Sequence, residues 1–247
     1  MRTLEVAHAS RFTFHRSVRL LHHEERTLME SPRFIAIEGP IGVGKTTLTR
    51  LLQPQFGGTV LLEVFEENPF LAAFYADRAR YAFQTQLFFL LSRYHHQKTE
   101  VPRGLAEGHL VSDYIFAKDR LFAELNLEGD ELALYENVHH ALAEQIRVPD
   151  VVVYLRADLD TLMSRIAFRD RPYERNMDPA YIARLSVAYD RFFEHYQACP
   201  VVTVDTGARH FPADPHAVNE VAALVRAALT EGLYQARLPL QSLLSNP

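Results

Sequence analysis

The sequence predicts an α/β fold, a three-layer sandwich in which helices cover both faces of a five-stranded parallel sheet. Short apolar runs rich in β-branched residues alternate along the chain with longer segments of helical periodicity. This alternation is typical of parallel sheets that are buried on both faces. Three of the apolar runs end in an acidic residue, and open α/β sheets bind their ligands at the carboxyl ends of the strands. The same pattern therefore predicts where a site would lie.

Five apolar runs are the predicted strands: RFIAIEG (33–39), GTVLLEV (58–64), GHLVSDY (108–114), DVVVYLR (150–156) and CPVVTVDT (199–206). Helical periodicity predicts helices over residues 67–79, 81–99, 131–146, 158–169, 178–197 and 214–231. Glu63, Asp113 and Asp205 belong to the ends of three strands. We expect these acids to line one crevice at the carboxyl edge of the sheet.

The length of 247 residues fits one domain with terminal extensions, and we assign the domain to residues 31–232. Residues 1–30 show no clear helix or strand pattern before their last part. Their glutamates argue against a transit peptide, so we favour a disordered extension or a start codon placed too far upstream, with Met29 as the true first residue. Residues 233–247 are interpreted as a C-terminal tail.

The composition is that of an ordinary globular protein, with 48% hydrophobic and 23% charged residues. The formal net charge of −5 argues against nucleic acid or an anionic membrane as a partner. No apolar run approaches the ~18 residues of a membrane span. Cys199 is the single cysteine and has no partner for an intramolecular disulfide, which indicates a reducing compartment. We therefore expect a cytoplasmic protein.

The segment FIAIEGPIGVGKTTLTRLL (34–52) contains the phosphate-loop (P-loop) pattern G-x-x-x-x-G-K-[ST] between a predicted strand and a predicted helix. Its glycines let backbone N–H groups turn toward a phosphate, and the following helix offers its positive N-terminal end. Lys45 would bridge the β- and γ-phosphates, and the Thr46 hydroxyl would bind Mg²⁺. The expected ATP-binding residues are Gly39, Pro40, Ile41, Gly42, Val43, Gly44, Lys45, Thr46 and Thr47, with Arg169 and Asp205 later in the chain.

The remaining motifs favour a kinase over a switch protein or a hydrolase. The N-K-x-D element of guanine-specific switch proteins is absent, and the strand HLVSDY offers Asp113 alone where a mechanical ATPase usually has adjacent acids. The segment SRIAFRDRPYE carries Arg165, Arg169 and Arg171. Three guanidinium groups on one short segment suit a lid that closes on a transferring phosphoryl group and excludes water, although a solvated helix end would have the same composition.

Through these motifs, residues 32–229 resemble the deoxynucleoside kinase family. The resemblance implies ATP-dependent phosphorylation of a deoxynucleoside 5′-hydroxyl, with Mg²⁺ as cofactor and a homodimer or heterodimer as the assembly. Glu63 in EVFEENPFL is similar to the catalytic base of the family, although Val64 replaces the proline of the usual E-P-V. Lys45 and the three lid arginines would stabilise the charge that develops during transfer.

The resemblance also implies a nucleoside pocket. Gln86 and Arg93 share one face of the predicted helix YAFQTQLFFLLSRY, and Asp119 aligns with an acid of the base pocket. Tyr75 and Glu174 align with the residues that hold the sugar 3′-hydroxyl. We expect a purine rather than thymine, because a glutamine amide can pair with a purine Watson–Crick edge while an Arg–Asp pair would crowd the thymine 5-methyl group. Most of the aromatic residues of this helix are assigned to the core rather than to a ligand platform, from the set Phe83, Phe88, Phe89 and Tyr94.

The segment VSDYIFAKDR departs from the Asp/Glu-Arg-Ser pattern of many family members. The acid is kept as Asp113, which with Thr46 would hold Mg²⁺, but Tyr114 stands where the family has arginine. This form resembles the bacterial deoxyguanosine kinase branch, so we expect deoxyguanosine as the favoured substrate, with deoxyadenosine or deoxycytidine as alternatives. The missing arginine keeps a regulatory kinase subunit open as a second hypothesis, and a P-loop hydrolase is the third.

Overall fold

The computed structural model describes residues 31–207, 209–231 and 235–237. At its centre lies one parallel sheet with the strand order β2-β3-β1-β4-β5-β6. The strands are β1 (Phe34–Glu38), β2 (Thr59–Leu61), β3 (Leu110–Ser112), β4 (Val151–Arg156), β5 (Val201–Asp205) and β6 (Gln235–Arg237). The first five are the five predicted strands, so the predicted parallel α/β sandwich is confirmed.

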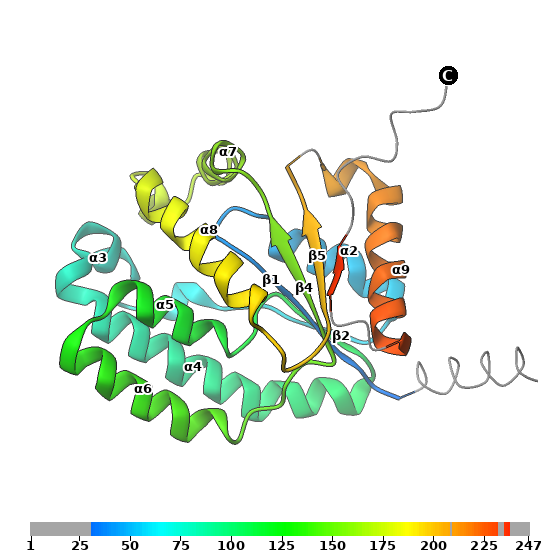
Figure 1. Ribbon diagram of the computed structural model, residues 1–247, viewed down its shortest axis with the longest axis horizontal. Coiled ribbons are helices and arrows are strands. Elements are labelled where there is room, and N and C mark those ends of the chain that lie inside the picture. Colours follow the sequence, from blue (N-terminus) through cyan, green and yellow to red (C-terminus); the bar gives the residue numbers. More distant parts are fainter. Residues whose placement is uncertain (1–30, 208, 232–234, 238–247) are drawn as a thin grey trace, which may run out of the picture.

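Helices cover both faces of this sheet. They are α2 (Lys45–Phe56), α3 (Leu71–Ala76), α4 (Arg78–Glu107), α5 (Lys118–Asn126), α6 (Gly129–Ala143), α7 (Leu159–Arg169), α8 (Pro179–Glu194) and α9 (Pro215–Glu231), with 3₁₀ turns at Phe65–Glu67, Pro172–Glu174 and Phe211–Ala213. Figure 1 shows α2 and α9 on one side of the sheet and α4, α5, α6 and α8 on the other. Within the described ranges, no helix has the length and apolar character needed to cross a membrane.

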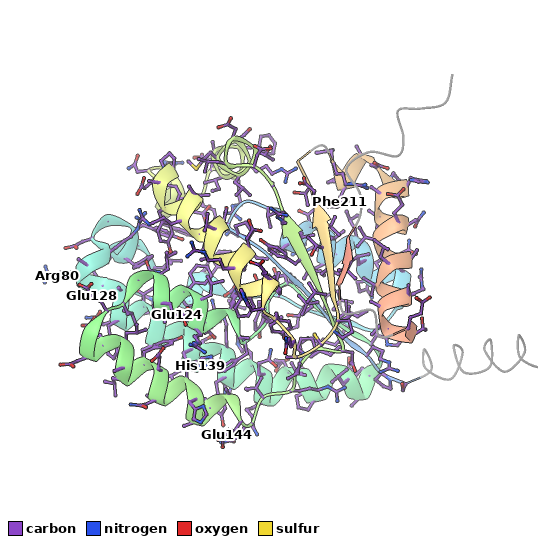
Figure 2. All side chains as sticks on the ribbon, viewed as in Figure 1. Arg80, Glu124, Glu128, His139, Glu144 and Phe211 are labelled. Carbon is purple, nitrogen blue, oxygen red and sulfur yellow. The ribbon has the colours of Figure 1, made fainter. Side chains whose placement is uncertain are left out.

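Both faces of the sheet are apolar because side chains alternate along each strand. In β1, Ile35 and Ile37 pack in a core cluster with residues of α2 and α9, whereas Phe34 and Ala36 pack in a second cluster with residues of α8. Side chains fill both layers between the sheet and its helices (Figure 2). Burial on both faces explains why the strands read as continuous apolar runs rather than as alternating patterns.

Three helix predictions differ from the structure. The segment 67–79 is not one helix, because Asp77 begins α4 as its N-cap and its side chain accepts a hydrogen bond of 3.2 Å from the Arg80 N–H. Helix α4 continues to Glu107, past the predicted end at residue 99, with Pro102 inside it. Helix α5 was not predicted at all.

The C-terminal boundary also differs. Residues 235–237 form β6, which pairs in parallel with β5 in the register Thr203↔Arg237. A strand of the sheet therefore lies beyond the boundary that the sequence predicted at residue 232. The predictions for residues 1–30, including a start at Met29, and for the rest of the tail fall outside the described residues.

The topology gathers four loops at the carboxyl edge of the sheet. In Figure 1 the arrows of β4 and β5 point toward the end of the molecule where α7 lies. The P-loop follows β1, Glu63 follows β2, Asp113 follows β3 and the α7 segment follows β4. Because parallel strands end at one edge, these four segments meet there although they are far apart in the sequence.

Candidate active site

The loop between β1 and α2 has the backbone geometry of a phosphate site. Gly42 and Gly44 have φ angles of 86° and 103°, which glycine adopts without strain. A Cβ atom at Gly42 would lie 2.7 Å from the carbonyl oxygen of Leu162 in α7, so only glycine fits this close approach. Gly42 and Gly44 both line the central cavity. The N-terminus of α2 is thereby placed to meet an anion.

The side chain of Lys45 is folded back onto this loop. Its Nζ donates hydrogen bonds to the carbonyl oxygens of Gly39 at 2.7 Å and Pro40 at 3.3 Å. Burial lowers the pKa of Lys45 to about 8, although the nearby Glu38 carboxylate acts in the opposite direction. A phosphate anion beside Lys45 would favour its charged form. The residue is therefore suited to an anionic ligand.

Thr46 and Asp113 form a pair of oxygen donors beside the loop. Thr46 Oγ1 donates to Asp113 Oδ2 at 2.6 Å, and Asp113 Oδ1 accepts the Glu63 backbone N–H at 2.7 Å. Burial raises the pKa of Asp113, although the hydrogen bond from Thr46 acts to lower it. Mg²⁺ prefers such donors combined with phosphate oxygens and water, so the pair fits a magnesium site that a nucleotide completes. The described residues contain no group of three or more His, Cys, Asp or Glu that could hold a metal ion by itself.

The carboxylate of Glu63 lies between two cations. Arg93 contacts Oε1 through Nε at 2.8 Å and also through Nη2, while Lys118 Nζ donates to Oε2 at 2.6 Å. Burial by itself would raise the pKa of Glu63, but the charges of Arg93 and Lys118 outweigh burial and hold this pKa well below its usual range. Glu63 lines the cavity as a fixed, ionised carboxylate.

The predicted base pocket is assembled from α4 and α5. Gln86, Arg93 and Asp119 are all buried, and Arg93 Nη1 forms the expected ion pair with Asp119. The guanidinium of Arg93 also holds Glu63, a contact that the sequence did not predict. One side chain thus links the base pocket to the proposed catalytic carboxylate. The cavity encloses about 120 Å³ and opens to solvent.

The segment after α7 closes over this cavity. Arg169 donates to Glu174 Oε2 from Nε at 3.1 Å and from Nη2 at 2.5 Å. The Tyr173 ring stacks on Tyr75 of α3, with the centroids 6.0 Å apart and the planes 7° from parallel. The Arg171 guanidinium lies 3.8 Å from the Phe65 ring centroid. Two of the three predicted lid arginines therefore reach the cavity together with both predicted sugar residues.

Arg165 and Asp205 lie elsewhere. Arg165 donates to Thr206 Oγ1 at 2.8 Å, to Thr206 O at 2.7 Å and to Val43 O at 3.2 Å, so it ties the P-loop to the segment after β5. Asp205 accepts the Gly207 N–H at 2.9 Å. Neither residue is among the described residues that line the cavity. The expectation of one crevice shared by Glu63, Asp113 and Asp205 is right for the first two and wrong for Asp205.

The predicted residues that line the cavity are Ile41, Gly42, Gly44, Lys45, Thr46, Glu63, Tyr75, Gln86, Arg93, Asp113, Arg169, Arg171 and Glu174. The other predicted residues are not among those that line it: Gly39, Pro40, Val43, Thr47, Asp119, Arg165 and Asp205.

Sequence reasoning missed several residues of the cavity wall, among them Lys118 and Phe89. Lys118 was passed over, although it lies in the segment that departs from the family pattern and is one of three lysines among 26 basic residues. Phe89 was assigned to the core, but it lines the cavity, and the Arg93 guanidinium lies 4.7 Å from its ring centroid. Its spacing from Gln86 and Arg93 on one helix indicated this position.

Known proteins resemble this chain over most of its length. The family model for deoxynucleoside kinase matches residues 35–230. A deoxyguanosine kinase of Bacillus subtilis (strain 168) is 34% identical over 203 residues, which are 80% of this chain and 98% of the relative. A deoxyadenosine kinase of Lactobacillus acidophilus is 29% identical over 211 residues, with 80% and 96% covered. The structure of deoxyadenosine kinase from M. mycoides with bound dCTP has a TM-score of 0.67 at 24% identity and covers 77% of this chain and 99% of its own.

Proposed function

Because the chain belongs to the deoxynucleoside kinase family, we propose that it transfers the γ-phosphoryl group of ATP to the 5′-hydroxyl of a purine deoxynucleoside, with deoxyguanosine as the favoured substrate. As a member of this family, the chain is an enzyme of nucleoside salvage whose product is a deoxynucleoside monophosphate. The choice of base, the cofactor and the roles of single residues rest on the geometry of the site.

The buried set of Gln86, Arg93 and Asp119 is the observation that carries the purine assignment. The Gln86 amide both donates and accepts, so it can pair with N1 and O6 of guanine or with N1 and N6 of adenine. The N–H groups of Arg93 that neither Asp119 nor Glu63 uses suit O6 and N7 of guanine. Thymine would leave such donors unpaired, which rejects a substrate more strongly than a lost methylene does. Deoxyadenosine or deoxycytidine is the alternative substrate.

We assign the transfer chemistry to residues of the cavity wall. Glu63 accepts the proton of the 5′-hydroxyl, while Lys45, Arg169 and Arg171 hold the charge that develops on the phosphoryl oxygens. Thr46 and Asp113 hold Mg²⁺, which neutralises phosphate charge when bound. Tyr173 and Phe65 contact each other edge to face at the cavity wall, and Arg171 lies over the Phe65 ring. This cover excludes water as a competing acceptor.

A strongly ionised Glu63 is compatible with this role. Its two cations make it a weak base, but phosphoryl transfer passes through a loose transition state in which positioning contributes more than proton removal. The hydroxyl proton needs to leave only after the new O–P bond has begun to form. A carboxylate fixed from both sides then orients the hydroxyl and receives the proton late.

The remaining assignments concern the sugar, the donor base and the assembly. Tyr75 and Glu174 face the same cavity and would share the 3′-hydroxyl. Arg165 and Asp205 border the segment after β5, where they would position the donor nucleotide. A dimer is proposed from the family resemblance, and a cytoplasmic location from the use of a single cysteine, the buried Cys199.

The test is ADP release from Mg·ATP with each of the four deoxynucleosides and with none. We expect the highest kcat/KM for deoxyguanosine, a low value for thymidine and little ADP without a nucleoside. The P-loop variant Lys45→Met is the background control. A preference for thymidine would refute the purine assignment, and rapid ADP release without any nucleoside would identify a hydrolase.

A further inference from the structure

We infer that Lys118 is a positioning residue for phosphoryl transfer, which fixes the Glu63 carboxylate beside the acceptor hydroxyl. The inference deepens the proposed function, because it rests on Glu63 as the proton acceptor. It also identifies a cation for this site in a chain that carries Tyr114 directly after Asp113.

The contacts of Lys118 single out Glu63 as its partner. Lys118 is 3% exposed, and its Nζ lies 2.6 Å from Glu63 Oε2 but 3.9 Å from Glu38 Oε2. The Glu38 carboxylate is already occupied, since it accepts the Gly39 N–H at 2.9 Å, the Ile115 N–H at 3.1 Å and the Tyr189 hydroxyl at 2.9 Å. Lys118 is therefore committed to Glu63.

Lys118 lies at a position where a buried cation does little to stabilise the folded protein. It is the first residue of α5, and the positive end of the helix dipole disfavours a cation there. Burying an ion pair brings little net stability compared with an apolar pair of similar volume. The chain uses lysine at only three of its 26 basic positions, and two of these, Lys45 and Lys118, line the cavity. The ammonium group of Lys118 is a compact charge with three donors that rotate freely. This position carries it instead of the planar guanidinium of an arginine.

Lys118 and Arg93 hold the two carboxylate oxygens of Glu63 from different sides. Arg93 holds Oε1 and is itself anchored by Asp119 on the side of the base pocket. Lys118 holds the other oxygen, and it lies close enough to Lys45 for the two charges to influence each other. Without Lys118, Arg93 alone would hold the carboxylate, from the base-pocket side. The expected consequence is a slower transfer step with the ATP site intact.

The experiment compares Lys118→Met with Lys98→Met, which removes the same charge from an exposed position of α4. We expect Lys118→Met to lower kcat by ~10- to 10²-fold, the scale of one hydrogen bond between charged groups, with KM for ATP nearly unchanged. Lys98→Met should behave as the wild type. Lys118→Arg should recover part of the lost kcat because it keeps the charge. A wild-type kcat in Lys118→Met would overturn the inference.

A double-mutant cycle with Glu63→Gln tests whether Lys118 acts through Glu63. In the Glu63→Gln background, adding Lys118→Met should change kcat less than about twofold, because the partner carboxylate is gone. An equal loss in both backgrounds would show that Lys118 acts independently and would refute the positioning role. If Glu63→Gln alone keeps wild-type turnover, the proton acceptor is wrong, which is a separate result. Thermal melting checks folding, and Lys118→Gln replaces the methionine variant should that one fail to fold.

Discussion

At the residue scale, Arg93 links the proposed base pocket to the proposed proton acceptor. Its guanidinium contacts Asp119 on the base-pocket side and Glu63 on the phosphate side. We therefore expect a substitution at Arg93 or Asp119 to disturb the proposed proton acceptor as well as the proposed base pocket. Gln86, buried on the same face of α4 and lining the cavity, is the cleaner position at which to change base preference. The structure thus distinguishes Gln86, which is hydrogen-bonded to neither Glu63 nor Asp119, from Arg93, which contacts both.

Glu63 offers the most direct test at this scale. We expect Glu63→Gln to lower kcat by at least ~10²-fold, the scale of general-base removal, because an amide cannot accept the hydroxyl proton. Nucleoside binding should be largely kept, since the amide fills the same volume. Steady-state kinetics and equilibrium titration with the nucleoside measure the two effects.

The matched control for this change is Glu67→Gln, which alters an exposed carboxyl four residues away. It should leave both kcat and KM unchanged. A Glu63→Gln variant with wild-type turnover would move the proton acceptor elsewhere, and Asp113 would then be the next carboxylate to substitute.

At the element scale, the packing of α6 contains a half-buried titratable group. His139 of α6 stacks with Phe116 at a centroid distance of 5.1 Å and with Tyr135 of the same helix at 6.2 Å. Figure 2 labels His139 on α6 and Glu124 on the neighbouring α5. Burial, together with the smaller effect of the positive charges of Arg120 and His140, lowers the pKa of His139 to about 4. The folded state therefore favours the neutral ring.

This shift predicts a loss of stability in acid. The histidine of the unfolded chain titrates near its ordinary value of about 6.5, so between pH 6.5 and 4 the unfolded state binds more protons than the folded state. The contribution of His139 to the free energy of unfolding is thus fully present above pH 6.5 and is lost as the pH drops toward 4. We expect His139→Phe to unfold with a smaller decrease in urea midpoint between pH 7 and pH 4.5 than the wild type shows.

His140→Gln is the control, because the His140 side chain is 83% exposed. Its urea midpoint should follow the wild type at every pH. Equal pH slopes for His139→Phe and the wild type would show that His139 does not favour the neutral form in the folded protein.

Several elements of the fold were predictable because their causes are local. The five buried strands appear as apolar runs, and the P-loop is one contiguous motif with glycines at positions 39, 42 and 44. Helix α5 escaped prediction because it is short and its capping residue, Ala117, supplies no side-chain hydrogen bond. The contact between Lys118 and Glu63 joins residues 55 positions apart, and helical or strand periodicity carries no information about such a pair. The position of Asp113 was predictable because ligands of open α/β sheets bind at the carboxyl ends of the strands. The same rule did not predict that the Asp205 side chain accepts a hydrogen bond from the nearby Gly207 N–H.

At the scale of the whole molecule, one edge of the sheet holds the candidate site, and exposed apolar residues lie on a separate surface. Phe89, Arg93 and Gln86 of α4 face the cavity, while Leu91 of the same helix is 49% exposed. Leu134 on the contacting helix α6 is 53% exposed. Figure 1 shows α4 and α6 side by side along one margin of the molecule. A dimer formed through these helices would leave the nucleoside cavity open.

We therefore expect the wild type to sediment as a dimer and the double variant Leu91→Glu, Leu134→Glu to sediment as a monomer. Two carboxylates placed in an apolar interface would lose hydration without gaining partners, while the same residues in a monomer would remain in water and leave folding intact. Val187→Glu on α8, where valine is 49% exposed, is the matched control and should stay dimeric. Sedimentation velocity at several protein concentrations measures the mass, and thermal melting checks the fold. A double variant that remains a dimer would place the interface on another surface, and a monomeric wild type would refute the assembly itself.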